Sequence, residues 1–250
     1  MAGTILETRG LTKSFGSFVA VDDITLGIPR RSLVSVIGPN GAGKTTMFDM
    51  ISGKVAPTGG CIRYDGERID GLPEYRIARR GIARSFQITN FYPELPVREN
   101  VRLAVQAGQG SFLDTIRRHE RLDDVRERTE EILDRIDLLE DADRHAADLA
   151  HGQQRHLEVG IGLGSDPDLL LLDEPTAGMS AKETSEITGL IDRLAAEMTL
   201  LMVEHDMEIV MGVSDRIIVM NDGTVLADGT PQEVRNDERV QDIYLRRGRQ

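Results

Sequence analysis

Residues 38–45 combine glycines, a lysine and a hydroxyl group at a spacing that suits phosphate chemistry. They read Gly-Pro-Asn-Gly-Ala-Gly-Lys-Thr and match the pattern G-x-x-x-x-G-K-[ST]. A short apolar run, residues 33–37, precedes them, and a stretch with helical character follows until Gly53. Such a loop presents successive backbone N–H groups, and the N-terminus of the following helix adds positive potential. The sequence therefore predicts a phosphate-binding loop between a strand and a helix.

The side chains and the backbone of this loop have separate tasks in the expected site. Lys44 would bind the β- and γ-phosphates of a nucleotide, Thr45 would place its hydroxyl on Mg²⁺, and Thr46 would assist at the phosphates. The residues expected to contact the nucleotide are Gly38, Pro39, Asn40, Gly41, Ala42, Gly43, Lys44, Thr45 and Thr46. The loop by itself fits a kinase, a GTPase, a helicase or a transport ATPase, so the rest of the chain must decide between them.

Two adjacent acids, Asp173 and Glu174, end a second apolar run, residues 169–172. A run this short is typical of a buried strand, and open α/β sheets bind ligands at the carboxyl ends of their strands. Burying two carboxylates without a cation is costly, and Mg²⁺ bound to ATP supplies one. We therefore expect Asp173 to hold Mg²⁺ through a water molecule and Glu174 to polarise the attacking water. The alternative is that both acids cap the helix that follows.

A third apolar run, residues 200–203, ends in Glu204, His205 and Asp206 and repeats this layout. A histidine at such a strand end can donate a hydrogen bond to the γ-phosphate and to the attacking water. We expect this role for His205. A purely structural role is the alternative, and it is the preferred interpretation for the chain's other four histidines.

Length and charge limit the possible functions. The chain has 250 residues, 40% of them hydrophobic, and a formal net charge of −12 from 42 acidic and 30 basic residues. This acidic balance, without a long basic tract, disfavours nucleic acid and anionic lipid as partners. The longest apolar stretch is too short to span a bilayer, and the first ten residues lack the apolar core of a signal peptide. We expect a soluble protein that is not secreted.

Hydrophobic patterning predicts the elements that position these residues. Stretches 5–9, 19–28, 61–64 and 68–69 alternate apolar and polar residues like antiparallel strands. Residues 90–154 are rich in charged helical stretches, for example 129–139. Further on, 216–220 and 225–227 flank Asn221-Asp222-Gly223, a hairpin signal, and a helical tail begins at Pro231. The predicted fold class is α/β: a P-loop NTPase (RecA-like) core with an antiparallel β subdomain and an inserted α-helical subdomain.

Taken in order, the motifs of residues 5–245 resemble the ATP-binding subunit of ABC transporters. Besides the residues above, the resemblance rests on Gln87, which follows the predicted strand 82–86, and on Leu-Ala-His-Gly-Gln-Gln at 149–154. It implies that Gln87 senses the γ-phosphate or Mg²⁺, and that the signature residues Gly152 and Gln153 contact ATP bound to a second subunit. It also implies a single ABC ATPase domain over residues 1–250. Within it, residues 1–90 and 155–250 would form the nucleotide-binding core and β subdomain, and 91–154 the helical subdomain.

The same resemblance assigns an aromatic contact and marks two departures from the family pattern. Phe15 would stack on adenine; the alternative is a core phenylalanine. The usual signature is LSGGQ, so Ala150 and His151 replace a serine and a glycine. Ser180 stands where many relatives have aspartate. The contact with the γ-phosphate and the communication between two ATP sites would differ accordingly.

Three short sequence segments indicate one branch of the family. The stretches 91–101, 177–179 and 203–207 are similar to those of importers of branched-chain amino acids and similar small polar solutes. This resemblance implies ATP and Mg²⁺ as cofactors and a second ATP-binding subunit, either an identical copy or a close paralogue. It also implies transmembrane permease subunits docked near residues 91–101 and an external solute-binding protein that acts indirectly. The chain would lie at the cytoplasmic face of the cell membrane. The alternatives are an importer for urea or short amides, a soluble ABC ATPase with a non-transport task, and a regulatory module with an inactive site. Lipid export is a less favoured transport function.

Overall fold

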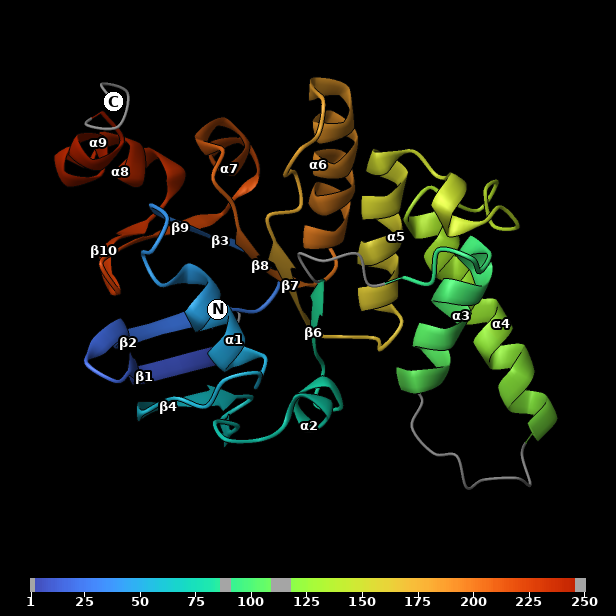
Figure 1. Ribbon diagram of the computed structural model, residues 1–250, viewed down its shortest axis with the longest axis horizontal. Coiled ribbons are helices and arrows are strands. Elements are labelled where there is room, and N and C mark those ends of the chain that lie inside the picture. Colours follow the sequence, from blue (N-terminus) through green and yellow to red (C-terminus); the bar gives the residue numbers. More distant parts are fainter. Residues whose placement is uncertain (1–2, 86–90, 109–117, 246–250) are drawn as a thin grey trace.

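The computed structural model describes residues 3–85, 91–108 and 118–245. A six-stranded sheet with the order β10-β9-β3-β8-β7-β6 forms its centre (Figure 1). These strands are β3 (Leu33–Ile37), β6 (Ile82–Ser85), β7 (Leu169–Asp173), β8 (Thr199–Val203), β9 (Arg216–Asn221) and β10 (Thr224–Gly229). The pairs from β9 to β6 are parallel, and β10 pairs antiparallel with β9. The three apolar runs that precede the candidate site residues are therefore strands, as predicted.

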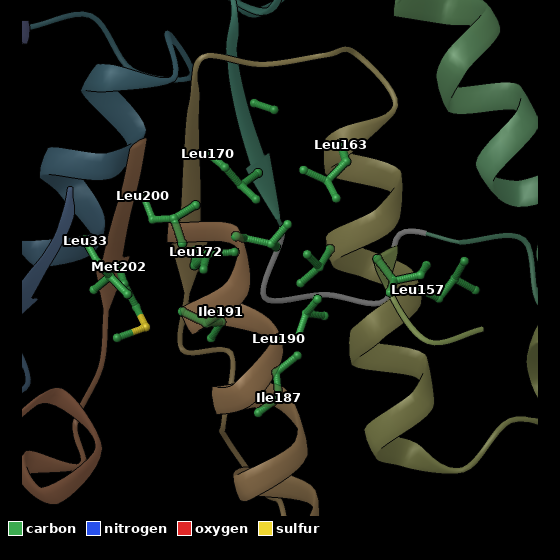
Figure 2. Packing of buried hydrophobic residues seen from close by; sticks show 14 of the residues in the cluster. Leu33, Leu157, Leu163, Leu170, Leu172, Ile187, Leu190, Ile191, Leu200 and Met202 are labelled. Carbon is green, nitrogen blue, oxygen red and sulfur yellow. The ribbon is translucent and has the colours of Figure 1, made fainter. Parts of the chain in front are cut away.

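The central strands are buried on both faces, which explains why they read as continuous apolar runs. Alternate side chains enter two different cores. Leu170 and Leu172 of β7 pack toward α5 (His151–Leu163) and α6 (Ala181–Ala195), as Figure 2 shows. Leu169 and Leu171 point to the opposite face and join the core around α1.

Helix α1 (Lys44–Ile51) lies between the central sheet and a second, antiparallel sheet. Its Met47 and Phe48 are fully buried in the core that both sheets share. The second sheet has the order β2-β1-β4-β5. Its strands are β1 (Thr4–Phe15), β2 (Phe18–Pro29), β4 (Gly59–Tyr64) and β5 (Glu67–Arg68). The alternating stretches of the sequence thus form antiparallel strands, as predicted.

Helices α3 (Val97–Gly108) and α4 (Arg118–Arg135) pack against α5 on the side away from the central sheet (Figure 1). The prediction that residues 129–139 are helical was wrong beyond Arg135. Asp137 is left-handed, with φ +58°, and Leu138 N donates to Leu133 O at 2.9 Å. This bond and the buried Leu133 and Leu138 side chains form a Schellman stop.

The remaining helices are short. Helix α2 (Glu74–Ala78) precedes β6, and α7 (Met207–Val213) follows β8. After the β9–β10 hairpin, whose turn residues Asp222 and Gly223 both have positive φ, the chain forms α8 (Pro231–Asn236) and α9 (Glu238–Leu245). The hairpin and the helical tail confirm the sequence prediction. None of the helices in residues 3–85, 91–108 and 118–245 has the length and apolar character that a membrane span requires.

Candidate functional site

The phosphate loop, the acidic pair and His205 meet at one edge of the central sheet. Strands β3, β8 and β7 are neighbours in that order and run parallel, so their carboxyl ends lie together. The loop leaves β3 after Ile37, His205 follows the end of β8, and Asp173 is the last residue of β7. This edge of a parallel sheet is where open α/β proteins bind ligands.

Two glycines of the loop are required by its backbone. Gly43, the residue before α1, has φ +97°, and a Cβ there would lie 2.4 Å from Ala20 O. Gly38 has φ +150°, and its Cβ would lie 2.1 Å from Met220 O. Any other residue would force the loop away from β2 and β9, so the glycines fix the curvature that turns N–H groups toward a phosphate.

Lys44 begins α1 and its ammonium lies across the inner side of the loop. Its Nζ donates to Gly38 O at 2.7 Å and to Pro39 O at 3.1 Å, and the residue is only 5% exposed. Thr45 beside it is exposed and Thr46 is half-buried. The loop thus places a cation and two hydroxyl groups around the N-terminus of one helix, an arrangement suited to the β- and γ-phosphates.

Glu174 and His205 contact each other directly. His205 Nε2 lies 2.5 Å from Glu174 Oε1, and Glu174 N donates to Val203 O at 2.9 Å, which ties the end of β7 to β8. Glu174 adopts φ +50°, an uncommon conformation for a residue with a long side chain. Helix α6 begins with Ser180 as its N-cap, so the acidic pair is not the cap of that helix.

Asp173 is buried beside a charge that the sequence did not reveal. Its Oδ2 accepts a hydrogen bond of 2.6 Å from Arg84 of β6, and Arg84 donates a second 2.6 Å bond to Asp49 Oδ1 of α1. The side chains of Arg84 and Asp173 are 7% and 1% exposed. Burial by itself would lower the pKa of Arg84, but the hydrogen bonds to Asp49 and Asp173 outweigh it and raise that pKa.

Glu204 is a second residue that sequence reasoning did not use. It is buried, and its Oε1 accepts from Thr176 N at 3.0 Å and from Thr176 Oγ1 at 2.7 Å. Its Oε2 accepts from His205 N at 3.0 Å. Glu204 therefore connects the segment after the acidic pair to the backbone of His205. Its place in the strand-end triplet Glu204-His205-Asp206 was the available signal.

The signature segment forms the N-terminus of α5. Gly152 N donates to Glu183 Oε1 of α6 at 3.1 Å. The Gln153 side chain accepts from Ala150 N at 3.1 Å and donates to Asp141 Oδ2 at 2.7 Å. Hydrogen bonds from Ser180 and then Gly152, with a smaller contribution from His151, lower the pKa of Glu183. The Gly152 N–H, which we predict to bind a phosphate, is therefore hydrogen-bonded to the Glu183 carboxylate of the same chain.

Phe15 lies at the end of the β1–β2 hairpin and is 51% exposed, so the core alternative was wrong. Lys13 Nζ lies 4.9 Å from the centroid of its ring. An exposed aromatic ring is available for stacking. Gln87 lies outside the described residues.

The fold and the site together define an ATP-binding cassette. One parallel sheet carries the phosphate loop, the strand-end acids and the histidine, and an antiparallel sheet and a cluster of helices lie beside it. The family model "ABC transporter" matches residues 21–177, and the model "Branched-chain amino acid ATP-binding cassette transporter" matches residues 224–245. The chain belongs to the ABC transporter family. It is an ATP-binding and ATP-hydrolysing subunit.

Individual relatives match over nearly the full length. The chain is 43% identical to the "High-affinity branched-chain amino acid transport ATP-binding protein BraF" of Pseudomonas aeruginosa, covering 98% of this chain and 99% of BraF. It is 42% identical to LivG of Escherichia coli, which has the same description, with the same coverage. The ADP conformation of MJ1267, an ATP-binding cassette of an ABC transporter, matches with a TM-score of 0.86 and 28% identity over 98% and 99% of the two chains. A dimeric post-hydrolysis state of the cassette MJ0796 with ADP and Pi matches with a TM-score of 0.75 and 26% identity, over 91% of this chain and 99% of that one.

Proposed function

We propose that the chain is the ATPase of an importer that moves branched-chain amino acids, or a similar small polar solute, across the cell membrane from its cytoplasmic face. The full-length likeness to BraF is the observation that carries this proposal. The match of residues 224–245 to the branched-chain amino acid model supports the same substrate class.

The geometry supports a mechanism for ATP hydrolysis. Glu174 is placed to take the proton of the attacking water at a carboxylate oxygen, and His205 Nε2 is placed to orient Glu174 and the γ-phosphate. As the water oxygen bonds to the γ-phosphorus, the bond from that phosphorus to the bridging oxygen of ADP breaks. Lys44 holds the phosphates through both states.

The oxygen donors at the sheet edge suit Mg²⁺. The Asp173 carboxylate and the Thr45 hydroxyl are hard oxygen ligands at the ends of β7 and the phosphate loop. We propose that these two residues hold Mg²⁺ together with the ATP phosphates, with Gln87 as a further ligand. The ion, when bound, neutralises charge on the phosphate oxygens.

A second ATP-binding subunit, either an identical copy or a close paralogue, completes the proposed site. In the described residues, no hydrogen bond links Gly152 to the phosphate loop of its own chain, while its N–H at the start of α5 is suited to a phosphate. We propose that Gly152 and Gln153 face ATP bound to the partner, and that the γ-phosphate displaces Glu183 from Gly152. Phe15 would stack on the adenine at the hairpin end.

A groove beside the core offers a place for a transmembrane permease subunit. It encloses about 770 Å³ between α2 and β6 on one side and α3 and α5 on the other. Tyr75 of α2 lines it and is 57% exposed. We propose that a permease subunit docks there, close to residues 91–101, and that residues 91–154 move as the helical subdomain when ATP binds. The last four of these residues lie within α5, so that helix would transmit the motion to the core.

Co-purification and uptake test this function. The tagged chain should retain transmembrane subunits in mild detergent, and proteoliposomes containing that complex and its solute-binding protein should accumulate labelled leucine when supplied with ATP. Uptake of urea or acetamide instead of leucine would contradict the substrate class. Recovery with ribosomes and without membrane proteins would contradict the importer and favour a non-transport ATPase.

A further inference from the structure

Arg84 connects three segments of the candidate site through charge. It lies on β6, three residues before Gln87, and donates to Asp173 at the end of β7 and to Asp49 in α1, each at 2.6 Å. The guanidinium nitrogen that donates to Asp49 also lies 3.3 Å from Ser52 Oγ. The guanidinium carbon is 5.8 Å from the centre of the Phe48 ring. The guanidinium therefore rests on the helix that begins with Lys44 while it holds the acid at the end of β7.

Burying these charged side chains costs free energy, which must be offset by other interactions. A buried guanidinium loses its hydration, and Arg84 Nε has no hydrogen-bond partner among the described groups. Lys54 Nζ also lies 3.8 Å from Asp49 Oδ1, but its side chain is half exposed and screened by water. The buried groups, two carboxylates and one guanidinium, therefore carry a net charge of −1. A buried acidic excess beside a predicted metal ligand favours a divalent cation at that edge.

We propose that Arg84 is a positioning residue that holds Asp173 through Oδ2, leaves Oδ1 to the divalent cation or its water, and together with Asp49 sets the cation affinity of the ATP site. This inference rests on the proposed metal-binding role of Asp173. It identifies Arg84 as the counter-ion of Asp173 and Asp49 as a second acid near it. Neither residue belongs to the sequence motifs. The phosphate-loop helix, β6 and the metal ligand are then coupled through one side chain.

The proposal predicts opposite effects for the two ends of the network. Removing the positive charge with Arg84→Gln leaves Asp173 without its cation and Asp49 with only the half-exposed Lys54, so divalent-cation affinity rises, on the order of tenfold. Removing a negative charge with Asp49→Asn lowers that affinity by a similar factor. The double variant restores the wild-type charge and returns the affinity to within about twofold of wild type. The kcat of ATP hydrolysis nevertheless falls in Arg84→Gln and in the double variant, because Asp173 has lost its tether.

The test measures Mn²⁺ binding by electron paramagnetic resonance in the presence of a non-hydrolysable ATP analogue, with kcat and the apparent Mg²⁺ constant measured in parallel. Arg84→Lys keeps the charge but loses the two-pronged geometry, so it should retain wild-type Mn²⁺ affinity while kcat recovers only in part. Arg216→Gln is the matched control. It removes the two hydrogen bonds between Arg216 of β9 and Asp228 of β10, and it should change neither the Mn²⁺ affinity nor kcat.

The outcomes separate this proposal from the function it rests on. Unchanged or weaker Mn²⁺ binding in Arg84→Gln would overturn it, because the charge of Arg84 would then not set the cation affinity of the site. If Arg84→Gln does not fold, Asp49→Asn decides: it retains the Arg84–Asp173 bond, and unchanged Mn²⁺ affinity overturns the proposal. Asp173→Asn tests the underlying site, and full Mn²⁺ affinity in that variant would instead contradict the metal-binding role of Asp173.

Discussion

Glu174 and His205, the two residues that we propose act on the attacking water, contact each other directly. The two residues follow adjacent parallel strands, and a backbone bond from Glu174 N to Val203 O fixes their separation. Glu204 supports the same region by accepting from both Thr176 and the His205 backbone. These bonds hold the proposed general base in position before substrate arrives.

Glu174→Gln should keep nucleotide binding within about twofold and reduce ATP hydrolysis on the order of 100-fold or more, the usual contribution of a general base. Glutamine retains the shape of the side chain but cannot take the proton from water. A phosphate-release assay and a fluorescent-nucleotide titration measure the two quantities. Glu208→Gln, an exposed acid at the start of α7, serves as the control and should behave like wild type. Normal turnover by Glu174→Gln would remove Glu174 from this role.

Sequence reasoning could identify residues that stand at recognisable places along the chain. Lys44, Asp173, Glu174 and His205 each follow an apolar run, so the ends of the runs marked them. Arg84 escaped notice because its partners are 35 and 89 residues away, and only the fold brings them together. A charged residue inside the predicted strand 82–86 was the one local sign.

At the level of elements, the first turn of α5 and the first turn of α6 are joined through Glu183. Its carboxylate accepts from Ser180 N, completing the capping box of α6, and also from Gly152 N of α5. Ser180 therefore has a local task that an aspartate could also perform. The N-terminus of α5 is occupied by a negative group of its own chain. In the proposed pair of subunits, the γ-phosphate of ATP bound to the partner displaces this group.

Glu183→Gln should strengthen ATP-dependent pairing of subunits by about two- to fivefold, because a neutral amide binds Gly152 N–H more weakly than a carboxylate does. Glutamine still completes a capping box, so α6 should keep its stability. Analytical ultracentrifugation with ATP and a hydrolysis-deficient background measures the dimer constant. Glu186→Gln, which alters an exposed pair with Lys182 on the same helix, is the control. Weaker pairing in Glu183→Gln would contradict the displacement of Glu183.

Most elements could be predicted from the sequence, because buried parallel strands and alternating antiparallel strands have different patterns. Their order could not. β6, β7 and β8 are consecutive strands, joined by connections that contain the helices α3 to α6, but β3 lies between β8 and β9, which come five and six strands later in the chain. The end of α4 was also hidden, because Asp137 adopts a left-handed conformation that usually falls to glycine or asparagine.

The whole molecule combines a net charge of −12 with a cationic phosphate site. Lys44 and the N-terminus of α1 supply local attraction, and the distant acids are screened at physiological salt. Where the surfaces of two copies approach within a Debye length, the excess of acidic residues opposes pairing without nucleotide. ATP can drive closure only if it binds the closed pair better than the open subunits, by several kcal/mol.

The most direct test of this account is the molar mass of Glu174→Gln measured by light scattering with and without ATP and Mg²⁺. We predict that the mass doubles when ATP is added, and that the wild-type chain forms such a pair only until phosphate is released. A mass that stays at one subunit with ATP, together with no phosphate release by the wild-type chain even when its transmembrane subunits are present, would contradict the account.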